Sequence, residues 1–131
     1  MEFGRFALPL FKELFAPDVS VKFLHNDAQC KISAPFLPQI CVNLFNMGFD
    51  VPLNELKTLT RNQVTLLGNI PPRDVLASGS PADVTRATKE LINSLKDRSR
   101  VILSCGGGLP PGVKSENVKA FVEAVKSQPT S

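Results

Sequence analysis

The sequence predicts an α/β fold with a parallel sheet, formed either as a small open sheet or as half of a (β/α)₈ barrel. The chain repeats one layout: a short apolar run, a polar or glycine-containing corner, and then a helical pattern. Short, mostly apolar runs are typical of parallel strands that are covered on both faces. Strand–helix units in series imply right-handed parallel crossovers, and four units are too few for a closed barrel of about 250 residues.

The elements follow from hydrophobic spacing and from helix signals. Phenylalanines and leucines three and four residues apart predict an amphipathic helix over residues 3–15, which Pro17 ends. Strands are expected at 19–24, 41–45, 64–67 and 100–103. Further helices are expected at 33–40, 52–59, 81–96 and 116–126, with a helical turn at 72–77.

Particular residues mark the helix starts and inner faces. Ser33 and Ser80 are expected to cap their helices, and Pro52 suits the first helical residue. The inner face of the helix at 81–96 is expected to contain Val84, Leu91, Ile92 and Leu95. The inner face of the last helix is expected to contain Val118, Phe121, Val122 and Val125.

Length and composition indicate one domain over residues 1–131, with a loose polar tail at 127–131. The net charge of +3 is small, and no basic stripe with aromatic platforms indicates nucleic-acid binding. No apolar run reaches the roughly 20 residues of a membrane span. Three irregularly spaced cysteines argue against a disulfide framework and for a reducing compartment, so a cytoplasmic location is expected.

Polar and glycine residues gather at the expected carboxyl ends of the strands, where parallel α/β proteins build their sites. These candidates are His25, Asn26, Asp27, Asn46, Asn69, Cys105 and the glycines 106–108.

His25 is the only histidine, and Asp27 lies two residues later. Alternating side chains in an extended strand place both on the same side, which suits joint ligation of a metal or acid–base catalysis. The alternative is that Asp27 caps a turn and His25 is a hydrogen-bonded structural residue.

The cysteines have functional and structural interpretations. His25, Asp27 and Cys105 have the ligand types of an open zinc site, whereas Cys105 alone would be a small buried hydrophobe. Cys30 is a second metal candidate, although an exposed loop cysteine is the simpler interpretation. Cys41 falls in an apolar run and is expected in the core.

The Gly106–Gly108 segment lacks both the dinucleotide-binding spacing and the phosphate-loop lysine. It could bring backbone N–H groups to an anionic ligand, or it could be a tight turn. Asn69 could bind a ligand or fix a turn through its own backbone. Arg73 could meet an acidic substrate, but a solvated loop arginine is the simpler interpretation.

Four segments in order resemble the uroporphyrinogen decarboxylase superfamily, which includes corrinoid-linked, zinc-dependent methyltransferases. The segments are Phe23–Ala28, Asn43–Asn46, Leu67–Pro72 and Ile102–Gly112, and the opening helix at residues 6–12 also matches. The resemblance covers essentially the whole chain and implies the C-terminal half of a TIM (β/α)₈ barrel. It further implies tetrapyrrole decarboxylation or methyl transfer from a methyl-corrinoid, with zinc as the cofactor of the second.

The chain departs from both branches of the superfamily. The methyltransferases have His-x-Cys at the first strand end, where this chain has His25 and Asp27, and a later cysteine where it has Gly107. The decarboxylases have a histidine at the Gly107 position.

Catalytic and metal roles are therefore predicted for His25, Asp27 and Cys105, and substrate contacts for Asn46, Asn69, Gly106, Gly107 and Gly108. The alternative is a non-catalytic half-barrel, which exposes two strand edges and its inner face. Such a chain would form a homodimer or complete a barrel with a separate N-terminal half.

Overall fold

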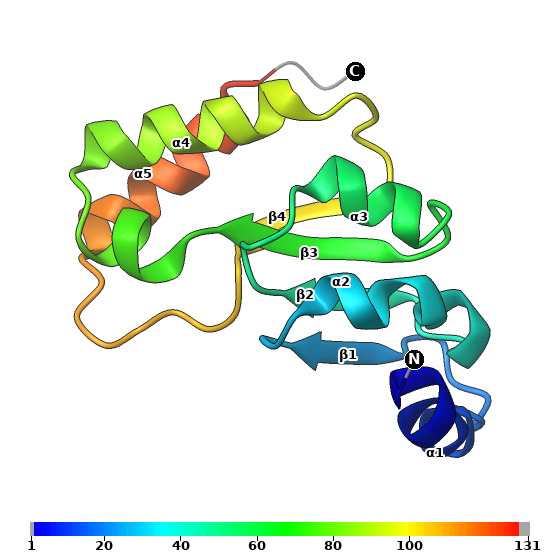
Figure 1. Ribbon diagram of the computed structural model, residues 1–131. Coiled ribbons are helices and arrows are strands. Elements are labelled where there is room, and N and C mark those ends of the chain that lie inside the picture. The colour runs from blue at the N-terminus through cyan, green and yellow to red at the C-terminus, as the bar shows by residue number, and fades with distance from the viewer. Residues whose placement is uncertain (1, 129–131) are drawn as a thin grey trace.

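A computed structural model describes residues 2–128 of the 131-residue chain. Its centre is one parallel four-stranded sheet in the order β1-β2-β3-β4, so that each strand pairs with the next in sequence (Figure 1). The strands are β1 (Phe23–Asn26), β2 (Leu44–Met47), β3 (Thr65–Ile70) and β4 (Val101–Cys105). This confirms the predicted parallel α/β fold, built from units of the kind found in a TIM barrel.

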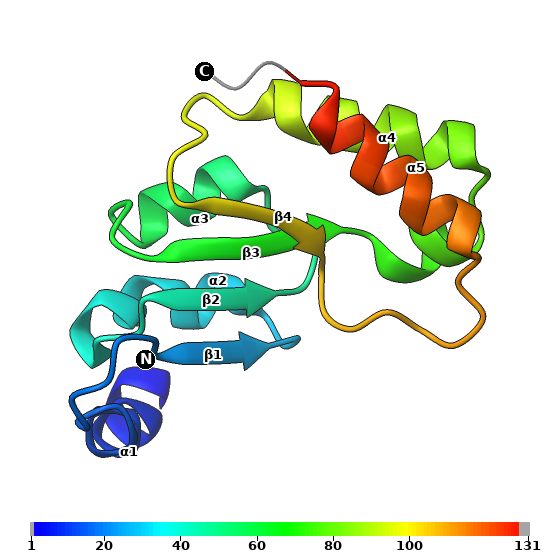
Figure 2. The same ribbon diagram turned by 180° about the vertical axis from the view of Figure 1, so that it is seen from behind.

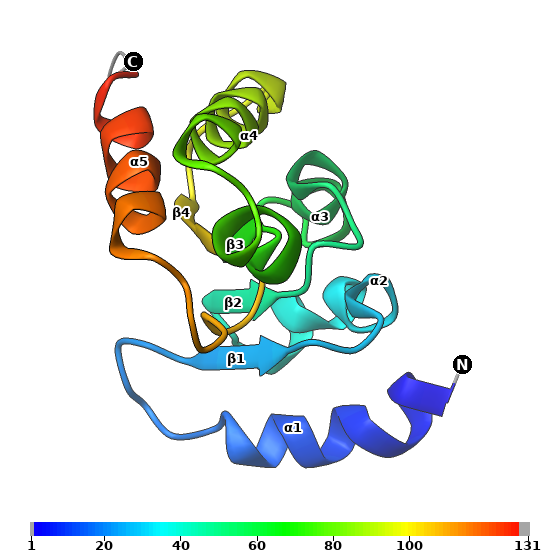
Figure 3. The same cartoon turned by 90° about the vertical axis from the view of Figure 1, so that its left-hand side faces the viewer.

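The helices connect the strands and form an arc around the sheet (Figure 3). In chain order they are η1 (Phe3–Ala7), α1 (Leu8–Leu14), α2 (Cys30–Ser33), η2 (Ala34–Ile40), α3 (Leu53–Leu59), η3 (Pro72–Ala77), α4 (Pro81–Ser94) and α5 (Ser115–Lys126). Helix α1 lies beside β1, and α4 and α5 lie together at the β4 end of the sheet.

One face of the sheet packs against the helices and forms the core. Phe45 and Leu66, which are register partners on β2 and β3, are both fully buried there. A large cluster joins this face to α2, η2 and α3, and a smaller cluster of Ile70, Leu76, Val84, Cys105 and Ala120 lies under α4 and α5.

The opposite face of the sheet is open. This agrees with the half-barrel alternative, which exposes an inner face, and corrects the expectation that the strands are covered on both faces. Phe23 on β1 is 47% exposed and Ile102 on β4 is 49% exposed. Between them, Leu44 and Leu67 are only half-buried. Figure 2 shows the sheet from behind the view of Figure 1, with α5 over the β4 end. The strands are apolar although only one face is packed.

The strands lie further along the chain than hydrophobicity predicts. The strand expected at 19–24 begins at Phe23 and extends to Asn26, and the one expected at 41–45 begins at Leu44 and extends to Met47. Asn46 and His25 therefore lie within paired strand backbone, as register partners.

The helix starts are partly as predicted. Ser80 accepts a hydrogen bond from the Asp83 backbone N–H, and Asp83 accepts one from the Ser80 backbone, which is a complete capping box. Ser33 makes no capping bond, because its hydroxyl bonds Cys30 O and accepts from Asn26. Pro52 precedes the helix as its N-cap, since α3 begins at Leu53.

The two terminal helices each leave an apolar stripe exposed. On the first, Phe6, Leu10 and Leu14 are 62%, 62% and 70% exposed. On α5, Val118 and Val122 are exposed, whereas Ala120 and Ala124 are buried, so the predicted inner face is wrong for the two valines. The inner face predicted for α4 is confirmed at Val84 and Ile92.

Within residues 2–128, none of the helices combines the length and apolar character needed to cross a membrane. Most of the tail predicted at 127–131 lies outside the described residues.

Candidate functional site

The carboxyl ends of the strands bring most of the predicted polar residues to one end of the sheet, which faces the viewer in Figure 3. His25 and Asn46 are register partners on β1 and β2. Asp27 lies just past β1, and the glycine segment after β4 passes in front of the ends of β1 and β2. This end of the sheet is the candidate site.

Asn46 orients the His25 ring. His25 Nδ1 lies 2.7 Å from Asn46 Oδ1, and Asn46 Nδ2 donates to the carbonyls of Leu67 at 2.6 Å and Cys105 at 3.3 Å. Because the amide nitrogen faces two carbonyls, its oxygen must be the atom that faces the ring. Nδ1–H therefore donates to Asn46 Oδ1. The neutral ring then carries its lone pair on Nε2 and makes no hydrogen bond to Asp27, because the carboxylate is also an acceptor.

Asp27 lies beside that second ring nitrogen, with Oδ2 at 3.1 Å from His25 Nε2. The side chains of His25 and Asp27 are 43% and 63% exposed, in contrast to the buried Asn46. The fixed amide therefore determines which nitrogen carries the proton, while the carboxylate can turn toward an incoming proton, metal or substrate. The predicted placement of positions 25 and 27 on the same side agrees with this contact.

Asn26 shapes the corner that presents Asp27. Its Oδ1 accepts from the Ala28 backbone N–H at 2.9 Å, and its Nδ2 donates to Ser33 Oγ at 3.0 Å. A side-chain oxygen that binds the backbone N–H two residues on forms an Asx turn. Sequence reasoning placed Asn26 at the site but missed this role, which an asparagine directly after a strand could have indicated.

The glycine segment approaches the site closely. A Cβ on Gly106 would lie 3.1 Å from the backbone of Gly48 and Phe49, so a side chain there would collide with the corner after β2. Gly107 has a φ of +90°, and a Cβ on it would lie 2.9 Å from Asp27 Oδ1. The residue at position 107 is thus a direct neighbour of the Asp27 carboxylate.

Cys105 does not join a three-ligand group with His25 and Asp27. Its thiol donates to Gly107 O at 2.9 Å, and among residues 2–128 no three His, Cys, Asp or Glu side chains are arranged to hold a metal ion. His25 and Asp27 supply two donors, one fewer than the three protein ligands of a catalytic zinc site. The donor set in the described residues is therefore incomplete for zinc, and no chemical step is assigned to a metal.

The other two cysteines lie opposite to expectation. Cys30 is fully buried, and its thiol lies 3.6 Å from Asp50 Oδ1. Burial, and then the Asp50 carboxylate, raise the pKa of the Cys30 thiol to about 12. Cys41 is exposed because η2 ends there in a left-handed turn with φ at 58°, before β2 begins.

Asn69 and Arg73 differ in what they contact. Asn69 Nδ2 donates to the carbonyls of Val51 at 2.9 Å and Gly48 at 3.4 Å, so this side chain holds the corner after β2. Arg73 is exposed and lines a cleft of about 300 Å³ that also includes Asp27 and the glycine segment.

A mainly apolar groove of about 490 Å³ leads to the other side of His25. Phe3, Phe11, Leu24 and Ile32 supply its apolar walls. His25 thus lines an apolar groove, and Asp27 lines a separate polar cleft. No sequence pattern indicates this groove, since its walls come from η1, α1, β1 and α2 together.

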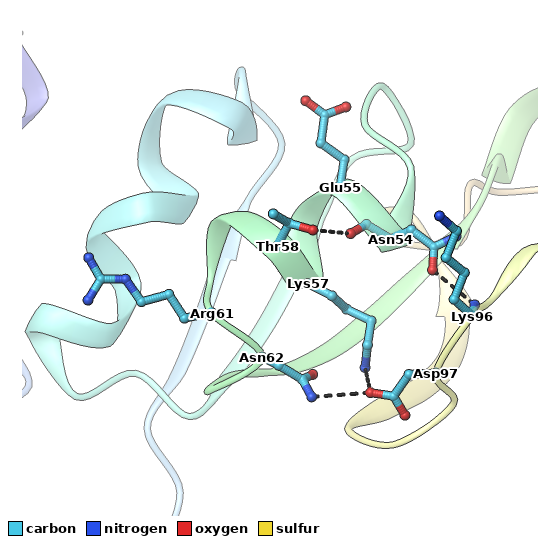
Figure 4. A pocket seen from close by; sticks show the side chains of 8 residues that line it. All are labelled: Asn54, Glu55, Lys57, Thr58, Arg61, Asn62, Lys96 and Asp97. Atoms are coloured by element: carbon cyan, nitrogen blue, oxygen red, sulfur yellow. Dashed lines mark hydrogen bonds and ion pairs between the residues drawn. The ribbon is translucent and has the colours of Figure 1, made fainter.

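A larger cleft of about 560 Å³ lies at the opposite end of the sheet (Figure 4). Lys57 Nζ is nearly buried there and contacts Asp97 Oδ2 at 3.2 Å and the Ser99 carbonyl, and Asn62 also donates to Asp97. Hydrogen bonds from Ser99, followed by Lys57, lower the pKa of Asp97 to about 2. These contacts fasten the segment before β4 to α3, which is a structural function.

Comparisons with known proteins agree on the family. The uroporphyrinogen decarboxylase (URO-D) family profile matches residues 1–128. The chain is 27% identical, over 128 residues, to a methylated-thiol--coenzyme M methyltransferase of Methanosarcina mazei, a match that covers 97% of this chain and 33% of that protein. The fold also matches a solved methyltransferase from Methanosarcina mazei, with a TM-score of 0.82 and 21% identity, over 95% of this chain and 36% of the other.

The chain therefore belongs to the uroporphyrinogen decarboxylase family, as its strand-end segments indicated. It spans about a third of the length of the two methyltransferases that it matches.

Proposed function

We propose that this chain contributes the His25 end of the active site in a methyl-transfer enzyme of the family, with a thiol as the methyl acceptor. The observation that carries the proposal is the contact of Asn46 with His25 and of His25 with Asp27, in which a fixed amide leaves the Nε2 lone pair beside the Asp27 carboxylate. The names of the two similar proteins support methyl transfer over tetrapyrrole decarboxylation.

In this proposal His25 acts as a general base on the acceptor thiol. The thiol proton moves to Nε2, and the Asp27 carboxylate at 3.1 Å stabilises the resulting imidazolium. The acceptor sulfur, now a thiolate, forms a bond to the methyl carbon of the donor. The bond between that carbon and the donor breaks, and its electron pair leaves with the donor.

The apolar groove beside His25 is the proposed site for the acceptor's hydrocarbon part. The lining of this groove includes His25, Phe3, Phe11 and Leu24, although Leu24 lies on the face of β1 opposite to the imidazole. The polar cleft on the Asp27 side is lined by Arg73 and the glycine segment and also by the Asp27 and Asp74 carboxylates, so its lining does not favour a negatively charged end group.

The test is methyl transfer to a small thiol, measured with His25→Gln and a matched control. General-base loss costs roughly 10²- to 10⁴-fold in rate, so His25→Gln is expected to lose at least a hundredfold. Gln63→Ala, an exposed change outside the site, should retain full activity. Equal rates for His25→Gln and the native chain would contradict the proposal.

Thiol binding gives a second readout that does not need turnover. The ring signals of His25 should shift on titration with 2-mercaptoethanesulfonate, since it is the sole histidine. Unchanged ring signals at saturating thiol would also overturn the assignment.

A further inference from the structure

The polar cleft beside Asp27 has no part in the chemistry assigned to His25. Its volume is about 300 Å³, and its lining includes Asp27, Arg73, Asp74 and the glycine segment 106–108. These walls belong to the corners that follow β1, β2, β3 and β4, so the cleft lies at the carboxyl ends of all four strands. A cleft of this volume can hold a small organic molecule.

The charged side chains that line the polar cleft are not paired with one another. Arg73 and Asp74 are both exposed, and neither forms an ion pair with any residue that the structure describes. Asp27 contacts His25 Nε2, at 3.1 Å. Elsewhere on the described surface, opposite charges pair directly. Both signs of charge in the cleft are therefore available to a ligand.

The backbone of the glycine segment adds hydrogen-bond donors to the same cleft. Gly106 N–H donates to Ile70 O at 2.9 Å. The N–H groups of Gly107 and Gly108 donate to none of the residues that the structure describes. A Cβ on Gly108 would have no neighbour within 4 Å, so a ligand can approach this part of the backbone. Successive N–H groups of this kind bind carboxylates and other anions.

We propose that the polar cleft binds a zwitterionic amino-acid group, which carries one ammonium and one carboxylate. The carboxylate contacts Arg73 and the N–H groups of the glycine segment, and the ammonium contacts Asp74. A purely anionic ligand would face the Asp74 and Asp27 carboxylates, and a purely cationic ligand would face the Arg73 guanidinium. A zwitterion instead forms a charge-assisted hydrogen bond with a side chain of each sign.

Asp27 connects the polar cleft with the proposed reaction. Its carboxylate lines the cleft and also lies 3.1 Å from His25 Nε2. An amino acid with a thiol on its side chain can therefore bring its sulfur to His25 while its charged groups stay in the cleft. Amino-acid thiols as the class of methyl acceptor rest on the proposed function, whereas binding of the amino-acid group in the cleft does not.

Three thioethers that differ in their charged groups test the cleft without turnover. S-methylcysteine carries both groups, 2-(methylthio)ethylamine lacks the carboxylate, and 3-(methylthio)propionate lacks the ammonium. The amide NMR signals of Gly107 and Gly108, which line the cleft, report binding. S-methylcysteine is expected to bind about tenfold more tightly than either of the others, because each of these lacks one charge-assisted contact.

Two substitutions of exposed residues are expected to change this selectivity in opposite directions. Arg73→Gln should weaken S-methylcysteine and the propionate about tenfold, without weakening the amine. Asp74→Asn should weaken S-methylcysteine and the amine by the same factor, without weakening the propionate. Lys89→Gln and Glu90→Gln, at exposed positions of α4, are the matched controls and should change the binding of none of the three.

The zwitterion site would be overturned by equal affinities of the three thioethers, by equal effects of both substitutions on all three, or by no binding of S-methylcysteine. These outcomes are independent of the rate loss expected for His25→Gln. Selective binding together with an unchanged rate in His25→Gln would support the cleft and contradict the proposed chemistry. A rate loss in His25→Gln without selective binding would support the chemistry and contradict the cleft.

Discussion

His25 illustrates how a buried residue controls an exposed one. Asn46 is fixed by two carbonyls on neighbouring strands, and it in turn fixes the ring nitrogen that carries the proton. Sequence reasoning found both residues because they end apolar runs. It could not find their contact, because that depends on the register between β1 and β2.

Position 107 limits the space next to Asp27. Gly107→Ala would introduce a Cβ 2.9 Å from Asp27 Oδ1 at a φ of +90°, so it should destabilise the fold by about 1 kcal/mol or more and displace Asp27 from His25. Gly108→Ala is the matched control, since its Cβ would have no neighbour within 4 Å. Urea unfolding and His25 ring spectra should detect the first change only. Equal effects of both variants would contradict this account.

The cysteines provide a test of burial. With a pKa of about 12, the Cys30 thiol stays protonated at pH 8, where only about 1 in 10⁴ molecules carries the thiolate. Cys41 should therefore react with iodoacetamide in the native state, and Cys30 only after unfolding. Peptide mass spectrometry distinguishes the two sites, and rapid native labelling of Cys30 would be inconsistent with the structure.

The Cys30 thiol also makes the free energy of unfolding depend on pH. In unfolded chains the Cys30 thiol has its ordinary pKa of 9.0, whereas in the folded chain burial raises the pKa to about 12. The Cys30 contribution to the free energy of unfolding is thus present below pH 9 and is lost as the pH rises from 9 toward 12. Cys30→Ala should remove this dependence in urea titrations between pH 8 and 10. A slope that the variant retains would assign it to another group.

At the scale of elements, helix starts show where sequence signals suffice. The Ser80 cap was predictable because Ser80 and Asp83 have capping-box spacing ahead of an apolar stripe. Ser33 has the right residue type, but its hydroxyl accepts a hydrogen bond from Asn26 and donates one to the Cys30 carbonyl. These bonds at the corner after β1 replace the capping bond. Local pattern predicts a cap only where no tertiary partner competes.

Loss of the Ser80 cap should be measurable. Ser80→Ala removes a side-chain bond to the Asp83 N–H and should cost about 1 kcal/mol in urea unfolding. Ser78→Ala, two residues before the cap, should have little effect. No difference between the two variants would contradict the capping role.

The Ser80 bonds, followed by Arg86, also lower the pKa of Asp83 to about 2. The stabilisation is therefore present above the unfolded value of 3.8 and is lost as the pH falls from 4 toward 2.

At the scale of the whole molecule, the strand–helix order and the parallel sheet were predictable from the repeated layout of the sequence. The open face agrees with the half-barrel interpretation, which exposes the inner face of the sheet, whereas the apolar strands alone look the same whether one or both faces are packed. Helix α5 shows the same limit of sequence-based prediction. Its valines have the spacing of an inner face, but Ala120 and Ala124 let α5 pack closely by another side. Apolar spacing predicts an apolar helix face, and does not predict which face of the helix packs against the core.

The most direct test of the site is the protonation state of the sole histidine. Long-range ¹H–¹⁵N spectra of the neutral ring should show the proton on Nδ1, because Asn46 Oδ1 accepts at 2.7 Å and leaves Nε2 free beside Asp27. Asn46→Ala should abolish this preference. A neutral ring protonated on Nε2 in the native chain would contradict the account, since the lone pair proposed to receive the thiol proton would then be absent.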